Sequence, residues 1–180
     1  MANLEILFVD NPEHEKLLRS KSRKVQKVTP QLADLAHDMV ETMRGANGVG
    51  LAAPQIGVLQ RFFVAELPPD DEDELAGRTF ILFNPEIVKA RGEQIGAEGC
   101  LSIPGWVGEV ARADQVTVKA LDERGKEVRY KVEGYLARVF QHEIDHLDGI
   151  LFTDKLTDPA TLHRVEAGQE ETEEAEAALA

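Results

Sequence analysis

Cysteine is nearly absent from this 180-residue sequence, because Cys100 is the only one. A single cysteine excludes an intrachain disulfide, and a lone thiol is typical of a reducing compartment, where cysteine serves as a ligand or a nucleophile. The chain also lacks an apolar run long enough to span a bilayer. Its first residues carry neither the pattern of a secretory signal nor that of a transit peptide. We therefore expect a soluble protein of the cytoplasm.

Positive charge is scarce relative to negative charge. The chain has 20 Lys and Arg residues against 33 Asp and Glu residues, a formal net charge of −13. This excess disfavours a broad electrostatic affinity for nucleic acid or for an anionic membrane. The hydrophobic fraction of 43% and the charged fraction of 29% are ordinary for a globular protein, and the length suits one domain.

Two longer helices and one short helix are predicted from caps and apolar spacing. Thr29 suits a helix cap and Pro30 the first helical position, and apolar residues then recur three and four apart up to Met43. A second helix is expected from about Gly134 to Asp148, with Gly149 after its end. Residues 13–18, after an Asn-Pro pair, predict a short helix near the start of the chain.

Short segments rich in Val, Ile, Phe or Thr predict strands in the middle of the chain, and turn signals separate most of them. They are residues 61–67, 79–84, 107–111, 115–121 and 127–132. Several short strands with tight turns favour an antiparallel or mixed sheet over regular βαβ units. We expect an α+β fold in which short strands pack around the helix of residues 134–148. The main domain is expected to span residues 1–158, and residues 159–180 to form an acidic, partly disordered helix or tail.

The pentapeptide His142-Glu143-Ile144-Asp145-His146 is the most informative pattern in the chain. Helix positions four apart lie one above the other, so both imidazoles project from one face and can bind one ion. Glu143 then lies beside the ion, where it can handle a metal-bound water. An amphipathic helix that carries two histidines by chance is the alternative. It is disfavoured because two of only five histidines have this spacing around a glutamate.

A catalytic site of this type normally has three protein ligands and a water. The metzincin pattern would place a third histidine at position 152, which is Phe152, and glutamates after His146 begin only at Glu166. Cys100 is the better candidate, because a thiolate and two imidazoles make a good tetrahedral site for a divalent metal. A buried structural cysteine or a nucleophilic Cys–His pair remains an alternative, although the second leaves Glu143 unexplained.

The segment from Gly48 to Gln55 is the third notable one. Gly48 and Gly50 allow a close approach of the backbone, and their spacing matches neither a P-loop nor a dinucleotide fingerprint. Gln55 is a neutral amide that can donate to a developing oxyanion. Taken alone, the segment is also typical of a helix-to-strand turn with a packing surface of small residues.

Together the three segments resemble the peptide deformylase family. Its motifs are matched, in order, at residues 48–55, 98–102 and 141–146, and the resemblance extends over about residues 6–156. The resemblance implies a mononuclear metallohydrolase that removes the N-terminal formyl group from newly made polypeptides. It implies Cys100, His142 and His146 as metal ligands and Glu143 as general acid and base. It also implies that Gln55 and the backbone N–H of Leu101 stabilise the oxyanion.

The resemblance extends to the metal, the substrate and the partners. Ferrous iron is the implied ion, with nickel or cobalt able to substitute and zinc usually poorer. The implied substrate contacts are Val49, Gly50, Tyr135, Arg138 and Val139. Arg138 departs from an aliphatic lining, and we expect its stem to pack there with the guanidinium in water. Val107 stands where many relatives carry an arginine.

The implied substrate is an N-formylmethionyl nascent chain, with transient ribosome contact. The net charge gives no evidence of a direct affinity for nucleic acid. The implied protein is a monomer of bacterial type that touches no membrane. Two other functions share part of the pattern. A metalloprotease of internal peptide bonds lacks its third ligand here, and a closed structural metal site lacks a fourth.

Overall fold

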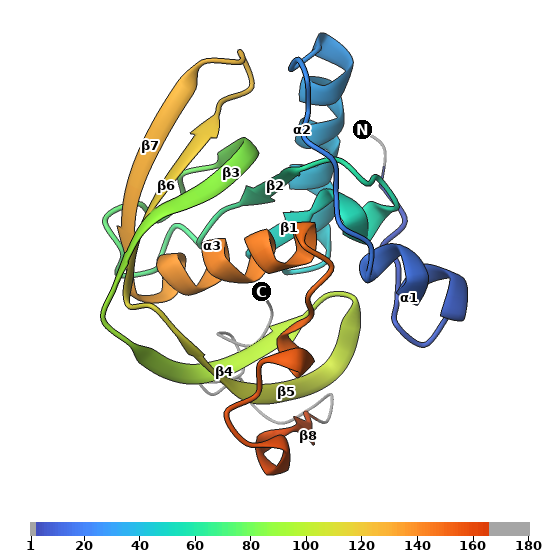
Figure 1. Ribbon diagram of the computed structural model, residues 1–180, viewed down its shortest axis with the longest axis vertical. Helices are drawn as coiled ribbons and strands as arrows, with labels where there is room; N and C mark the ends of the chain where they lie inside the picture. The colour runs from blue at the N-terminus through green and yellow to red at the C-terminus, as the bar shows by residue number, and fades with distance from the viewer. Residues whose placement is uncertain (1–2, 166–180) are drawn as a thin grey trace.

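The computed structural model describes residues 3–165. Two antiparallel sheets enclose a central helix, α3 (Gly134–Leu147), as Figure 1 shows. One sheet has five strands in the order β1-β2-β3-β6-β7, and the other has three in the order β4-β5-β8. Every pair of neighbouring strands is antiparallel. The expected α+β class, with strands around the helix that carries the His-Glu-x-x-His motif, is therefore confirmed.

The two other helices lie where they were predicted, and α2 begins at the predicted cap. In α1 (Pro12–Leu18), the Asn11 side chain accepts from the backbone N–H groups of residues 13 and 14. In α2 (Pro30–Gly45), the Thr29 hydroxyl accepts from the N–H of Leu32 at 3.3 Å. These caps satisfy N–H groups that have no partner inside the helix. Within residues 3–165, three 3-10 turns complete the helical elements: Ala53–Ile56, Phe152–Asp154 and Pro159–Thr161.

The strands are partly longer than the sequence predicts. The five-stranded sheet contains β1 (Gly50–Ala52), β2 (Phe62–Ala65), β3 (Phe80–Arg91), β6 (Gln115–Leu121) and β7 (Glu127–Glu133). The smaller sheet contains β4 (Gln94–Cys100), β5 (Ile103–Arg112) and β8 (His163–Arg164). The sequence did not predict β1 or β4. Two register shifts in β3 accompany its course from the larger sheet toward β4.

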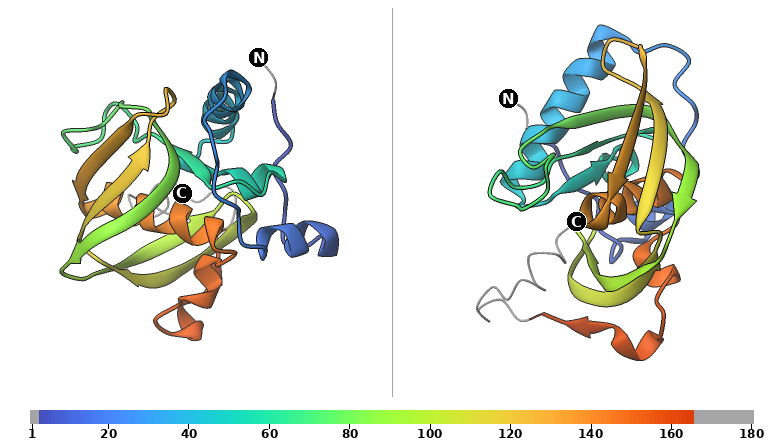
Figure 2. Two further views of the ribbon diagram at one scale, coloured as in Figure 1. Left: turned by 45° about the horizontal axis from the view of Figure 1, so that its top comes forward. Right: turned by 90° about the vertical axis from the view of Figure 1, so that its left-hand side faces the viewer.

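Strand β2 shows how α2 and α3 come to lie on opposite faces of the larger sheet. Phe62 and Val64 belong to the apolar cluster that contains the buried residues of α2. Phe63 and Ala65 belong to the cluster that contains those of α3. Successive side chains of a strand point to opposite faces, so this continuous apolar run serves two cores. Figure 2 shows the two helices on either side of these strands.

Aromatic packing holds α3 against the larger sheet. The Phe140 ring lies edge-on to the rings of Phe63 and Phe80, with centroids 5.4 and 5.2 Å apart. Burial of each such side chain stabilises the fold by roughly 1.5–3 kcal/mol, and edge-on contact adds to this. The helix that carries the motif is thus fixed by its buried face.

The chain beyond residue 158 differs from the expected helix. Pro159–Thr161 form a single 3-10 turn, and His163 and Arg164 then pair with Val107 and Trp106 of β5. Residues 166–180, which hold most of the expected acidic tail, lie outside the described residues, and the domain division stays a prediction. Among residues 3–165, no helix is both long enough and apolar enough to cross a membrane.

Candidate metal centre

The end of β4 and one face of α3 bring three metal-binding side chains together. Cys100, His142 and His146 each offer one donor atom, and these atoms lie within 4.8 Å of one another. The two imidazole Nε2 atoms are 3.2 Å apart, and Cys100 Sγ is 3.3 Å from His146 Nε2. Tetrahedral N and S ligands of a divalent ion lie roughly 3.3–3.6 Å from one another, so the spacing fits such an ion.

Strand alternation explains why β4 reaches α3 twice. Residues two apart in a strand point to the same face, so Glu98 and Cys100 both face the helix. The Glu98 carboxylate meets His142 and the Cys100 thiol meets His146. A register shift after Glu98 ends the regular pairing with β5. The metal motif of the helix is therefore completed by a strand some 40 residues earlier in the sequence.

Glu98 orients His142. Its Oε1 lies 2.8 Å from His142 Nδ1, and the carboxyl is fully buried. Burial alone would raise the pKa of Glu98, but hydrogen bonds from Arg112 and His142 hold that pKa well below its usual range. An ionised carboxylate can only accept, so Nδ1–H is the donor and Nε2 is left to face the other ligands.

Arg112 joins Glu98 to the next carboxylate of the helix. Its guanidinium makes two hydrogen bonds of 2.8 Å to Glu98 and a third to Asp145. Lys155 also donates to Asp145, at 3.0 Å. Burial opposes the charge of Arg112, yet its two carboxylate partners raise its pKa. The result is a buried chain of alternating charges that joins β4, β5 and α3.

The expectation for Arg138 was wrong in one respect. Its guanidinium is not in water, because the side chain is 3% exposed. It donates to Glu98 Oε2 at 2.6 Å and to the Val110 carbonyl at 2.9 Å. The missing side chain of Gly96 leaves the room, since a Cβ there would lie 3.1 Å from the Arg138 Nη2. Pairing with a buried carboxylate outweighed the hydration that a surface position would offer.

Glu143 is the one buried carboxylate of the site that has no hydrogen-bond donor. Neither of its oxygens has a partner among the described residues, and the residue is fully buried. Burial raises the pKa of Glu143 to about 7, although the positive charges of His142 and Arg112 oppose this. Gly50 lies against it so closely that a side-chain methyl would overlap its carboxyl group. The close approach expected of the glycine segment therefore occurs at Glu143.

Gln55 lies beside Cys100. Its Nε2 donates to Ser102 Oγ at 3.1 Å and lies 3.6 Å from Cys100 Sγ. Its Oε1 accepts from the N–H of Ala52 at 2.9 Å, which fixes the amide so that its NH₂ group faces the cluster. Leu101 follows Cys100 in the turn between β4 and β5.

Three of the expected substrate contacts share one apolar cluster. Val49 and Val139 are buried in it and Tyr135 packs against it. Burial also raises the pKa of Tyr135, as do nearby carboxylates. Val107, the other departure from the family pattern, is buried where β8 pairs with β5.

The sequence did not single out Arg112 and Asp145, and it gave no role to Glu98. A signal was present, because Arg112 lies two residues after Val110, on the same side of a strand, and Asp145 occupies a buried position of a helix. Buried charges are rarely unpaired, so each implied a partner. The identity of that partner depends on strand register.

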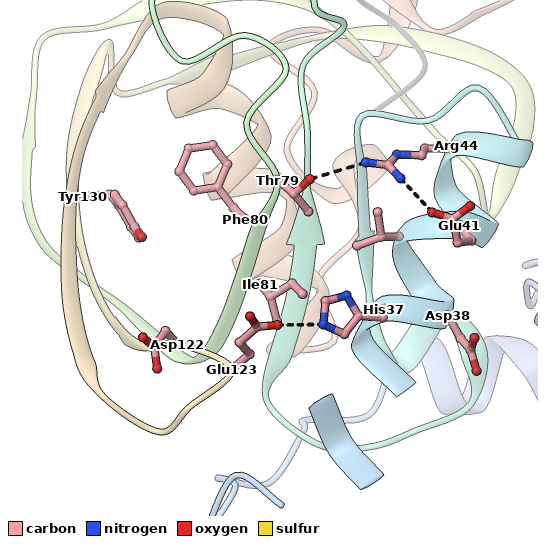
Figure 3. Close-up of a pocket in the computed structure, with 11 residues that line it drawn as sticks. His37, Asp38, Glu41, Arg44, Thr79, Phe80, Ile81, Asp122, Glu123 and Tyr130 are labelled. Atoms are coloured by element: carbon pink, nitrogen blue, oxygen red, sulfur yellow. Dashed lines mark hydrogen bonds and ion pairs between the residues drawn. The ribbon is translucent and has the colours of Figure 1, made fainter. Parts of the chain in front are cut away.

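A cleft of about 500 Å³ lies elsewhere, between α2, β3 and the β6–β7 hairpin (Figure 3). Two contacts cross this cleft or line it: His37 Nε2 lies 2.7 Å from Glu123, and Arg44 donates to Glu41 at 2.7 Å. None of its lining residues belongs to the Cys-His-His cluster. This cleft therefore lies apart from the metal-binding side chains.

The cluster fits a divalent metal with an open position. A thiolate and two imidazoles are borderline-soft donors that suit zinc and the later first-row metals. The oxygens of Glu143 lack the donor that a bound water would provide. His146 Nδ1 is also buried without a partner among the described residues. Burial lowers the pKa of His146, which keeps the ring neutral and able to ligate.

Comparison with known proteins gives the family. The family model for polypeptide deformylase matches residues 4–161. The peptide deformylase of Thermomicrobium roseum is 54% identical over 164 residues, which cover 91% of this chain and 93% of that protein. That of Roseiflexus castenholzii is 52% identical over 167 residues, covering 87% and 90%. The crystal structure of peptide deformylase from Thermus thermophilus has 48% identity and a TM-score of 0.75, covering 86% of both chains. This chain therefore belongs to the polypeptide deformylase family.

Proposed function

We propose that Cys100, His142 and His146 hold the catalytic ion of this enzyme and that Glu143 moves the proton. Membership of the family makes the chain a hydrolase that removes the N-terminal formyl group from nascent peptides. One observation carries the assignment of residues. Among the buried carboxylates around the cluster, only Glu143 has no hydrogen-bond donor among the described residues, and Glu143 directly follows His142.

The proposed reaction hydrolyses one amide bond, which joins the formyl carbon to the α-amine of the peptide. A divalent ion at the cluster supplies Lewis acidity and lowers the pKa of water toward about 7. Glu143 accepts a proton from the attacking water and returns it to the departing α-amine, so that formate and a free amino terminus result. Gln55 Nε2 and the N–H of Leu101 donate to the oxyanion that develops on the formyl oxygen.

The formyl-methionine end is held by the residues around the cluster. We assign Val49, Tyr135 and Val139 to the apolar wall against the methionine side chain, since they pack together beside α3. Gly50 admits the peptide close to Glu143. Arg138 is a positioning residue instead, because its polar group is committed to Glu98 and to backbone carbonyls.

Ferrous iron is the proposed ion, and nickel, cobalt or zinc suits the same donors. A lone thiolate with iron is open to oxidation, which would destroy the site. Metal content and formate release, measured for air-purified, anaerobic and nickel-exchanged samples, test this. We expect severalfold higher activity in the last two, and equal activity in all three contradicts the assignment of iron.

The remaining assignments concern the location, the oligomeric state and the partners of the protein. We propose a cytoplasmic monomer of bacterial type whose substrates are N-formylmethionyl nascent chains, with transient contact to the ribosome. The acidic composition argues against a general affinity for nucleic acid.

Glu143→Gln tests the mechanism. It keeps the shape of the side chain but cannot take a proton, so we expect formate release from formyl-Met-Ala-Ser to fall by about a hundredfold or more. Metal content should not change, because Glu143 is not a ligand. Near wild-type turnover in the metal-loaded variant contradicts the assignment.

Gly50→Ala tests the same residue through geometry, since the added methyl must displace the Glu143 carboxyl. We expect a loss in kcat larger than any change in KM. Gly45→Ala is the matched control, because its methyl meets only Asn3 Oδ1, at 3.8 Å. Equal activity of the two variants contradicts a positioned Glu143.

A further inference from the structure

A short basic segment, residues 16–27, stands apart from the acidic chain around it. It contains six positively charged residues and no Asp or Glu: Lys16, Arg19, Lys21, Arg23, Lys24 and Lys27. The whole chain carries −13, so removing these six positive charges leaves −19 for all other residues. All six side chains are exposed. The negative character of the composition therefore does not extend to this part of the surface.

The backbone of the basic segment is fixed. The N–H of Ser22 donates to the Leu147 carbonyl at 2.8 Å, and that of Arg23 donates to the Leu59 carbonyl at 3.0 Å. Val25 exchanges two hydrogen bonds with the Asn84 side chain, at 2.8 and 2.9 Å. Leu18, Ser22 and Val25 are buried between the exposed cations. The charges are thus presented on a framework that needs little ordering when a partner binds.

Most of these cations are not used by the fold. Arg19 forms ion pairs with Glu15 and Asp154. Among residues 3–165, the other five form no ion pair. By contrast, the three arginines Arg44, Arg112 and Arg138 each meet at least one carboxylate. The basic segment therefore offers uncompensated positive charge to a partner.

We propose that the basic segment is a docking surface for RNA. This rests on the proposed function, because a nascent chain emerges from a particle whose surface is largely RNA. Phosphates of a helical RNA present closely spaced negative charge, and lysine and arginine bind them through charge rather than base sequence. No large apolar residue of the segment is exposed, so it has neither a wedge for a membrane nor a platform for stacking bases.

The chain offers a matched control on the far side of the larger sheet. Lys89 of β3 and Lys131 of β7 both pair in register with Thr117, and both side chains are exposed without an ion pair among the described residues. Figure 1 places β7 on the left and α1 on the right, with residues 19–29 running from α1 toward α2. Reversal of two charges at either place changes the net charge equally.

The experiment compares Lys21→Glu/Lys24→Glu with Lys89→Glu/Lys131→Glu. Binding to purified ribosomes, to naked ribosomal RNA and to a fluorescent RNA duplex is measured between low and physiological salt. For the wild type we expect log affinity to fall linearly with log salt, with a slope of about −0.7 to −0.9 per phosphate contact. Reversal in the basic segment should lower affinity about tenfold or more, and reversal at the sheet by less than about twofold.

The outcomes separate docking from chemistry. Both variants should keep wild-type kcat and KM for free formyl-Met-Ala-Ser and an unchanged melting temperature. An equal loss of binding in both variants, or no binding of the wild type to RNA at low salt, overturns the proposal. Binding to ribosomes but not to naked RNA also overturns it and indicates a protein partner. A wild type that binds RNA but releases no formate contradicts the proposed function alone.

Discussion

Two glutamates of this chain each hold arginine side chains, one in the core and one at the surface. Glu98 meets Arg112 and Arg138, whose side chains are each 3% exposed. Glu66 meets Arg44, and these side chains are 14% and 47% exposed. Both carboxyl groups have a pKa below the usual value, since hydrogen bonds from the arginines outweigh burial. Only Glu98 touches a residue of the metal cluster.

The difference shows what each network can do. A buried ion pair costs several kcal/mol of desolvation per ion, which its attraction only roughly offsets, so it is a poor source of stability. Its geometry, however, cannot relax without leaving a charge unpaired. The two buried arginines are balanced by Glu98 and Asp145. We infer that the buried contacts of Glu98 fix the orientation of His142. The contacts of Arg44 with Glu66 and Thr79 only join α2 to the residues next to β2 and β3.

Among the variants that test this contrast, Glu98→Gln should have the largest effect on stability and on metal affinity. It leaves two buried guanidinium groups without their shared carboxylate, and loss of one partner of a buried pair costs about 3–5 kcal/mol. Glutamine also keeps only one acceptor oxygen and turns an NH₂ group toward the other donors, so the hydrogen bond from His142 Nδ1–H competes with the arginines for a single oxygen. Such outer partners contribute about 10–100-fold to metal affinity. Urea unfolding and chelator competition measure the two effects. Glu66→Gln is the matched control, and equal losses in both variants contradict the contrast between core and surface.

The fold around α3 could largely be predicted from the sequence. Its apolar period, the glycine after its end and the histidines four apart all depend on local spacing, which the helix fixes. β4 escaped prediction because its sequence, Gln-Ile-Gly-Ala-Glu-Gly-Cys, has little β-propensity. It is a strand because it pairs with β5 from Gln94 to Cys100.

The buried charges could not be assigned to partners for a related reason. Glu98 lies 14 residues before Arg112 and 40 before Arg138, and only the register of β4 against β5 brings the three together. Helical spacing correctly predicted that the Arg138 side chain faces inward, but not that its guanidinium is buried. The spacing reveals neither the Glu98 carboxylate nor the space over Gly96.

Arg138→Met should have an intermediate effect. The variant keeps the apolar stem and leaves Glu98 paired with Arg112 and His142. It leaves the Val110 carbonyl without this donor, so we expect a loss of about 1–3 kcal/mol and a severalfold weaker metal affinity. Arg138→Lys should recover part of both, since a single ammonium keeps the charge but not the fork geometry. A Met variant that is more stable and binds metal as tightly as wild type would show that Arg112 alone suffices to hold Glu98 in place.

Glu66→Gln should have the smallest effect, and its dependence on pH identifies its cause. Burial raises the pKa of Glu66, but hydrogen bonds from Arg44 and Thr79 lower it more, so the folded-state pKa lies below the ordinary 4.5. A carboxyl with a lowered pKa stabilises the fold above its unfolded pKa, and that stability is lost as pH falls through the folded value. Because Arg44 is half exposed, we expect less than about 1 kcal/mol at pH 7. The difference from wild type in urea unfolding should shrink below about pH 4.5 and in high salt, and metal affinity should not change. A difference that persists at low pH would assign the loss to packing rather than to charge.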